Sequence, residues 1–221
     1  MIGRSVLLVA VAGLLTTPRD ARGEWTLTGY LGASRTASTS LTLDQPSRGV
    51  HLSWTDVALA SRSVESPPYY GYRLAWFRSR TARLGIEAEL THLKVFAEPG
   101  SLAPAVQRFS ISHGLNLVLA NVIWRQPPAP DRRVRFSARG GAGFAVPHGE
   151  SEVFGVAQEQ YEVSSLALQG AAGPVVRLAS HLNAVAEYKL TTTRPSVSVA
   201  GGTMKGRFTS QHLAAGLEVW W

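Results

Sequence analysis

The 221-residue sequence contains no cysteine and only one long run of apolar residues. Without cysteine there is neither a disulfide framework nor a thiolate that could bind a metal or act as a nucleophile. The apolar run covers residues 6–15. It is shorter than the roughly 20 residues that a membrane-spanning helix needs, and no later segment comes closer to that length. If this chain crosses a membrane, it must therefore cross as strands.

The apolar run has the surroundings of a secretory signal peptide. Arg4 precedes it, and small residues stand at the third and first positions before Glu24. A buried N-terminal helix is the alternative, but polar residues follow the run at once. We expect residues 1–23 to be a signal peptide and residues 24–221 to form one domain. Because the leader carries three arginines and one aspartate, its removal lowers the formal net charge from +7 to +5.

The last ten residues alternate between two kinds of side chain. One face is apolar and carries Leu213, Ala215, Leu217, Val219 and Trp221. The other face holds small or polar residues together with one tryptophan: His212, Ala214, Gly216, Glu218 and Trp220. A strand of this kind suits a barrel wall with lipid outside and a polar interior. A final strand that stops on an aromatic residue is typical of bacterial outer-membrane barrels.

Seven further segments show a similar period-two pattern. The eight expected strands cover 25–36, 69–79, 83–96, 109–125, 133–146, 161–177, 183–194 and 205–221. Short connections alternate with long ones, which we place at 37–68, 97–108, 147–160 and 195–204. Short periplasmic turns and long external loops are the rule in such proteins. The sequence therefore predicts an all-β fold, an eight-stranded antiparallel transmembrane β-barrel in the outer membrane of a Gram-negative bacterium.

Six charged residues fall on the expected strands, opposite the apolar face. They are Glu87, Glu89, Arg135, Arg139, Glu187 and Lys189. A charge that faces lipid is costly, so we expect all six inside the barrel. They could be catalytic acids and bases, but an interior network of ion pairs that plugs a narrow barrel is the simpler interpretation.

Three histidines fall near the expected outer ends of three consecutive strands. His92 is in step with Leu90, His113 with Ile111 and Leu115, and His148 with Phe144 and Val146. We therefore expect all three to lean toward the lipid-facing side, at the level of the outer headgroups. With Glu150 or Glu152 they could form a site of histidines and a carboxylate, which suits Zn, Fe or Mn. The alternative is a polar girdle at the rim. Asn116 is expected on the inner face, where it could support His113.

Short segments around these residues resemble one family, the outer-membrane lipid A oxidases. The matching stretches are residues 67–71 (PPYYG), 89–97 (ELTHLKVFA), 112–116 (SHGLN), 146–148 (VPH) and 186–189 (AEYK). The family converts the proximal glucosamine of lipid A to 2-aminogluconate. The resemblance implies a reaction at the cell surface that uses O2 as co-substrate, depends on a divalent metal and yields peroxide.

From motif and strand phase we assign candidate roles within that resemblance. His92, His113 and His148 are the candidate catalytic residues, and the same three with Glu150 are the candidate metal ligands. Lys94 and Asn116 are the candidate substrate-binding residues, with Lys94 holding a lipid A phosphate. The expected partners are lipid A or lipopolysaccharide, to whose phosphates a basic surface is suited, and the outer-membrane bilayer. We also expect insertion by the barrel assembly machinery, a monomer, and no nucleic acid partner.

Three other functions remain open at this stage. A lipid A deacylase barrel uses a histidine followed two residues later by serine, but here that position is Leu115, and Ser112 precedes the histidine instead. This departure argues against an acyl-enzyme nucleophile. A non-enzymatic barrel that anchors the wall or binds a small molecule, and a soluble lipocalin-like barrel, are the remaining alternatives.

Overall fold

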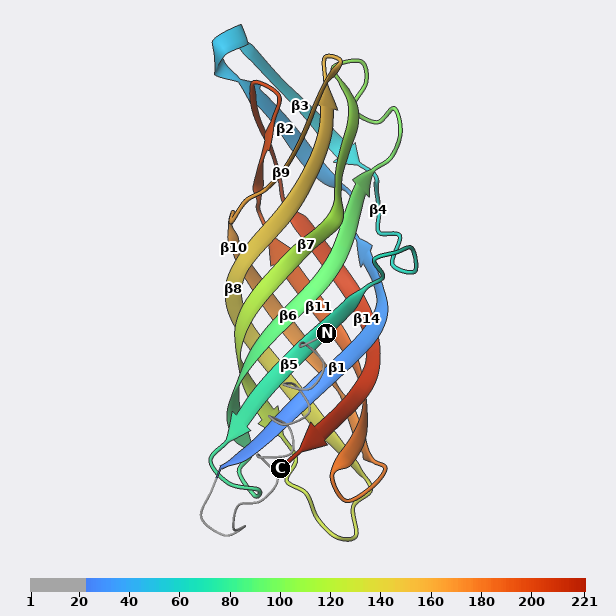
Figure 1. Ribbon diagram of the computed structural model, residues 1–221, viewed down its shortest axis with the longest axis vertical. Coiled ribbons are helices and arrows are strands. Elements are labelled where there is room, and N and C mark those ends of the chain that lie inside the picture. Colours follow the sequence, from blue (N-terminus) through green and yellow to red (C-terminus); the bar gives the residue numbers. More distant parts are fainter. Residues whose placement is uncertain (1–22) are drawn as a thin grey trace, which may run out of the picture.

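The computed structural model describes residues 23–221 as a closed antiparallel barrel that extends beyond the lipid-facing region into a smaller sheet (Figure 1). Eight strands of the described chain form the ring. They are β1 (Glu24–Thr36), β5 (Tyr70–Phe77), β6 (Leu84–Ala97), β7 (Val106–Arg125), β8 (Val134–Val153), β10 (Leu166–Arg177), β11 (Leu182–Thr193) and β14 (Phe208–Trp220).

The ring closes between the first and last of these strands. Thr26 of β1 stands opposite Trp220 of β14, and the pairing continues to Thr36 opposite Ser210. The predicted eight-stranded antiparallel barrel is thus confirmed. The predicted signal peptide lies outside the described residues, apart from Gly23. No helix in residues 23–221 is long and apolar enough to cross a membrane.

Two of the expected external loops, 37–68 and 195–204, build a second sheet above the barrel. Its strands are β2 (Thr39–Gln45), β3 (Val50–Val57), β12 (Ser196–Val199) and β13 (Gly202–Gly206), in the order β12-β13-β2-β3. A 3-10 turn (Pro46–Arg48) joins β2 to β3, and the short β4 (Leu59–Ala60) pairs with β6. Side chains fully or almost fully buried under this sheet include Leu41, Leu43, Val197, Val199 and Met204.

The loop expected at 147–160 is instead mostly strand. β8 continues to Val153, the chain turns at Phe154 and Gly155, and β9 (Val156–Tyr161) returns along it. The strand that follows, β10, consequently begins at Leu166 and not at residue 161. This long hairpin stands outside the lipid-facing part of the barrel and carries part of the candidate site.

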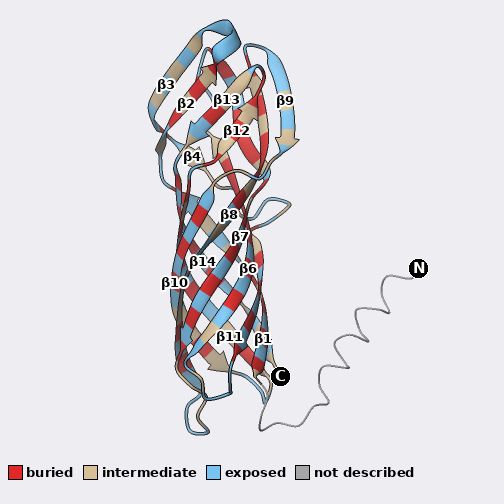
Figure 2. Ribbon diagram, turned by 90° about the vertical axis from the view of Figure 1, so that its left-hand side faces the viewer, coloured by how far each residue is buried: buried red, intermediate tan, exposed pale blue. Residues whose placement is uncertain are grey.

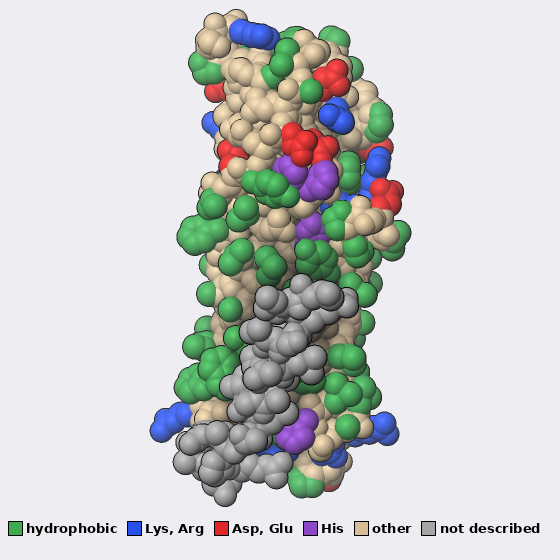
Figure 3. Space-filling view, in the orientation of Figure 1, with side chains coloured by type: hydrophobic (Ala, Val, Ile, Leu, Met, Phe, Trp, Pro, Cys, Tyr) green, Lys and Arg blue, Asp and Glu red, His purple; other side chains and the backbone are tan. Residues whose placement is uncertain are grey.

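Buried and exposed residues alternate along the lipid-facing parts of the barrel strands, as Figure 2 shows. The outward side chains form an apolar belt, visible in green in Figure 3, that includes Leu27, Leu74, Ile86, Val122, Phe136, Leu168, Leu190, Leu213 and Leu217. Trp25, Trp76 and Trp124 are exposed near the end where β1 starts and β14 stops. That end also has the short turns, so it is the periplasmic end, and the second sheet lies outside the cell.

Charged side chains fill the lumen. Arg73 Nη1 donates to Glu187 Oε2 at 2.7 Å, and Arg139 Nη1 approaches the same atom at 3.1 Å. Glu89 accepts hydrogen bonds from Lys189 and from Tyr30, the latter at 2.7 Å. All six charged residues expected inside the barrel lie there, and five of them join this network. Arg73, which is not among the six predicted charges, belongs to it as well.

Candidate functional site

A cluster of histidine and glutamate side chains lies on the outer wall above the apolar belt. His113, His148 and Glu159 each offer one possible ligand atom, and these three atoms lie within 4.8 Å of one another. His148 Nε2 lies 2.8 Å from Glu159 Oε1, and the centroids of the His113 and His148 rings are 4.8 Å apart. In Figure 3 histidines and acidic side chains gather on this face (purple and red). The site is therefore built from β7, β8 and β9.

The β8–β9 hairpin positions two of these three residues. His148 stands directly opposite Tyr161, and Glu150 directly opposite Glu159. Because side chains alternate along a strand, these four residues share one face of the hairpin. The Tyr161 ring stacks on the His148 ring at 3.8 Å and covers it, so that His148 is 5% exposed. His148 Nδ1 is buried and makes no hydrogen bond within the described chain.

An irregularity in β7 brings His113 to the same face. The β7–β8 register shifts between Ser110 and Leu115, and Gly114 adopts a φ of +124°. We expected His113 to share the lipid-facing side with Ile111 and Leu115, but both are buried, at 0% and 1% exposure. His113 nevertheless points outward, with 56% of its side chain exposed. The predicted outward direction of His113 is correct, but the predicted reason is wrong. Simple alternation would turn His113 inward with Ile111 and Leu115, and the bulge reverses this alternation.

Glu150 holds His113 in place. Its Oε1 accepts hydrogen bonds from His113 Nδ1 at 2.6 Å and from the Ser112 hydroxyl. Burial opposes the charged form, but these hydrogen bonds and the nearby imidazole outweigh it and lower the pKa of Glu150. Glu150 lies in the part of β8 beyond the membrane. Glu150, which we predicted as a metal ligand, orients His113 in the structure. The carboxylate that lies with the two histidines is that of Glu159.

His92 lies apart from the cluster, in a packed position behind Gly114. Its ring stacks on Tyr70 at 4.8 Å, and its Nδ1 is 2.9 Å from Asn116 Oδ1. It is 3% exposed, and its Nε2 is buried without a hydrogen-bond partner among residues 23–221. Since an amide oxygen accepts, Nδ1 carries the proton and Nε2 keeps its lone pair. The cluster of possible metal ligands, His113, His148 and Glu159, does not include His92.

The two predicted substrate-binding residues are also placed differently from the prediction. Asn116 lies on the outer face and contacts His92, whereas we expected it on the inner face beside His113. Lys94 is 4% exposed. Its Nζ donates to the carbonyls of Glu65 and Ser66 at 3.1 and 3.3 Å. Because these carbonyls enclose the ammonium group, Lys94 does not present its charge to a lipid A phosphate.

Glu159, Tyr161 and Tyr70 are not among the site residues predicted from the sequence. The first two lie on β9, in or next to the segment predicted as a loop. The available signal was the Phe154-Gly155 pair, which can form a turn between two polar stretches. Tyr70 belonged to a motif that the analysis quoted, but its stacking on His92 depends on the β5–β6 register, in which the two residues are opposite each other.

No protein-family model matches this sequence, and no curated protein matches it either. Solved structures do share the fold. The outer membrane protease OmpT from Escherichia coli is 8% identical, with 94% of this chain and 99% of that chain covered and a TM-score of 0.50. OprG from Pseudomonas aeruginosa is 9% identical, with coverages of 92% and 98% and a TM-score of 0.47. Ail of Yersinia pestis is 12% identical, with coverages of 90% and 99% and a TM-score of 0.38.

At such low identity the likeness concerns the fold alone, which is that of an outer-membrane β-barrel. The closed ring and the apolar belt around it agree with this fold. They place the chain in the outer membrane of a Gram-negative bacterium.

Proposed function

We propose that this protein modifies lipid A at the outer leaflet by oxidising its proximal glucosamine to 2-aminogluconate. The observation that carries the proposal is the cluster of His113, His148 and Glu159 on the outer wall. It faces outward just above the apolar belt, the level at which the sugar headgroups of outer-leaflet lipids lie. A pore or a soluble-ligand carrier would have its polar site in the lumen. The resemblance of short sequence segments to the lipid A oxidases also supports the proposal.

The donor set fits a divalent transition metal. Two imidazoles and one carboxylate on a single face, with open positions toward the lipid, suit Fe, Mn or Zn. The buried Nδ1 of His148 has no hydrogen-bond partner within the described chain, so this nitrogen is available to a ligand. When bound, Fe or Mn would supply the redox chemistry that O2 requires, whereas Zn²⁺ could occupy the site but is redox-inactive.

The chain's own residues would position the sugar and handle its protons. Glu150 fixes the His113 ring through Nδ1, and Tyr161 covers His148 against water. The sugar C1 gives up its hydroxyl proton and its C–H hydrogen together with two electrons. O2 takes them up and leaves as hydrogen peroxide, and water then opens the resulting lactone to the carboxylate. Because the free nitrogen of His113 would serve the metal, the exposed carboxylate of Glu159, which has a second oxygen, is the group on this face that would accept the hydroxyl proton.

The test is expression in a host whose lipid A carries a free anomeric hydroxyl, followed by mass analysis of the lipid. We expect a gain of one oxygen atom per lipid A, and loss of that gain on chelation and in His113→Ala and His148→Ala. His51→Ala is the matched control, because His51 is an exposed histidine on β3, away from the cluster. Unchanged lipid A in cells that carry folded parent protein would refute the proposal.

One contact favours deacylation as a second candidate function. Ser112, His113 and Glu150 touch one another, as a serine nucleophile, a base and an acid would. However, the serine hydroxyl and the carboxylate both meet His113 at Nδ1, and the serine also bonds the carboxylate directly. A catalytic triad uses the two ring nitrogens separately. The same mass analysis separates the two functions, because deacylation removes an acyl chain.

A further inference from the structure

The positive charge of the described chain is concentrated at its periplasmic end. The turns and strand ends there carry eight arginines: Arg78, Arg80, Arg83, Arg125, Arg132, Arg133, Arg135 and Arg177. The acidic residues in the same region are Glu24, Asp131 and Glu218. Elsewhere in residues 23–221 the positive and negative side chains are equal in number. The net charge of +5 therefore lies at the end opposite to the lipopolysaccharide, contrary to the expected role of a basic surface toward its phosphates.

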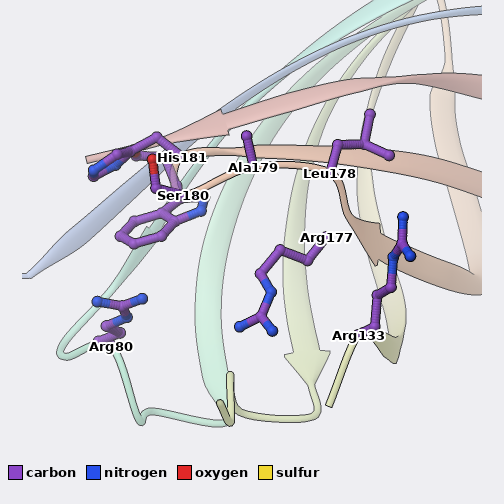
Figure 4. Close-up of a pocket in the computed structure, with 8 residues that line it drawn as sticks. Arg80, Arg133, Arg177, Leu178, Ala179, Ser180 and His181 are labelled. Carbon is purple, nitrogen blue, oxygen red and sulfur yellow. The ribbon is translucent and has the colours of Figure 1, made fainter. Parts of the chain in front are cut away.

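Three of these arginines line a cavity of about 480 Å³ across the periplasmic mouth of the barrel. Arg80 comes from the β5–β6 turn, Arg133 from the β7–β8 connection just before β8, and Arg177 from the end of β10 (Figure 4). Trp220 of β14 completes the wall on the inward-facing side of its strand. The Arg80 guanidinium lies over the Trp220 ring at 4.2 Å. Because these elements surround the mouth, the cavity faces the periplasm and not the lipid.

The arginines of this mouth are short of acidic partners. Arg125 pairs with Glu24, whereas Arg80, Arg133 and Arg177 have no carboxylate within 4.0 Å in the described chain. Arg177 donates instead to the carbonyls of Ala129 and Pro130, at 3.4 and 2.8 Å. Neutral carbonyls of this kind orient a guanidinium without cancelling its charge.

Arg135 strengthens this observation. It is 7% exposed and makes no hydrogen bond or ion pair within the described residues. It lines a second, smaller cavity, whose wall includes five arginines, Arg135 among them, and two carboxylates, those of Glu24 and Glu218. An anion held in the mouth would give this guanidinium the direct partner that it lacks.

We propose that this mouth is a binding site for the carboxylates of peptidoglycan stem peptides. Arginine binds carboxylate through two parallel hydrogen bonds, and three arginines around one cavity can engage more than one carboxylate. The polymer directly beneath the outer membrane carries such groups at regular intervals. An inner-leaflet phospholipid fits less well, since Trp220 and the cavity lie under the lumen and not at the lipid-facing rim. This site is independent of the histidine cluster and of its proposed chemistry.

The test measures co-sedimentation of the purified full chain, in neutral detergent, with insoluble peptidoglycan sacculi. We expect the parent to bind, and binding to weaken at least tenfold in the triple variant R80Q/R133Q/R177Q. The matched control is R48Q/R194Q/R207Q, which removes the same charge at the extracellular end and should bind as the parent does. Sacculi whose carboxylates have been amidated should not retain the parent. Resistance of the unheated barrel to SDS verifies that each variant is folded.

Several outcomes would overturn the proposal. Parent protein that fails to sediment with untreated sacculi rules out the site, and so does a mouth variant that binds as well as the parent. An equal loss of binding in the extracellular control would show that binding depends only on the net charge of the protein, and not on the mouth. A parallel arm uses phosphatidylcholine nanodiscs with or without phosphatidylglycerol. Mouth-dependent binding to the anionic nanodiscs, without binding to sacculi, would assign the site to lipid phosphate and contradict the carboxylate assignment.

Discussion

Gly114 decides which way the side chains of the candidate site point. Its φ of +124° belongs to a region that residues with a Cβ rarely adopt. A Cβ built at this position would also come within 2.5 Å of His92 Nδ1. One glycine therefore permits both the bulge that turns His113 outward and the packing of His92 behind it.

Gly114→Ala should disturb the site while the barrel persists. We expect a loss of stability of about 1–3 kcal/mol from the unfavourable backbone, and loss of lipid A oxidation because His92 and His113 are displaced. Urea unfolding in lipid vesicles and the lipid A mass profile measure the two effects. Gly155→Ala is the control, since Gly155 also has a positive φ of +76° but nothing lies within 4 Å of its Cβ position. If both variants behave alike, packing against His92 is irrelevant.

Glu150 should make a pH-dependent contribution to stability. Its pKa is lowered from the usual 4.5 because hydrogen bonds from Ser112 and His113 outweigh the effect of burial. A carboxyl group with a lowered pKa stabilises the folded protein fully above its ordinary pKa, and this contribution is lost as the pH falls through the lowered value. The difference in unfolding free energy between the parent and Glu150→Gln should therefore be greatest at neutral pH and shrink below pH 4.5. A pH-independent difference would contradict this assignment.

The β8–β9 hairpin is the element on which the site depends. It places His148 and Glu159 on one face and stacks Tyr161 on the imidazole, while β7 contributes the other histidine. Loss of one ligand should therefore abolish metal binding without unfolding the barrel, because the hairpin projects beyond the lipid-facing wall.

Zinc binding provides a test that does not depend on activity. Zn²⁺ added at about 100 times its dissociation constant should stabilise the parent by about 2.7 kcal/mol, and Glu159→Gln should lose most of this gain. Thermal unfolding in detergent, with and without Zn²⁺, measures it. Glu152→Gln is the matched control, since Glu152 is a carboxylate on the same hairpin outside the cluster. Equal stabilisation of Glu159→Gln and the parent would show that Glu159 is not a ligand.

The β8–β9 hairpin and the β7 bulge mark the limit of what the sequence can predict. Period-two alternation identified the barrel strands and the inward charges, because lipid outside and ion pairs inside impose opposite demands on neighbouring residues. The same rule failed at the β7 bulge, where one irregular stretch reverses the phase. It also missed Glu159, since a hairpin in water lacks the apolar face that makes a membrane strand recognisable. Lys94 appeared available for a phosphate because only the fold shows the carbonyls that enclose it.

At the scale of the whole molecule, the barrel is held from inside by its charges. Glu89 lies at the centre of this network and contacts Lys189, Tyr30, Asn121 and Gln169. Strands β1, β6, β7, β10 and β11 are thereby tied across the lumen. A network of this kind specifies how the wall closes, and it obstructs ion flow through the barrel.

Lys189→Met should destabilise the protein strongly. It removes the cation beside Glu89 and leaves a buried carboxylate with weaker compensation, which costs about 3 kcal/mol or more. The double variant Glu89→Gln/Lys189→Met should recover much of this loss, because no isolated charge remains. Unfolding by urea in lipid vesicles compares the three proteins. If the double variant were as unstable as the sum of its two single changes, the two residues would be acting separately, and the network could not be what closes the lumen.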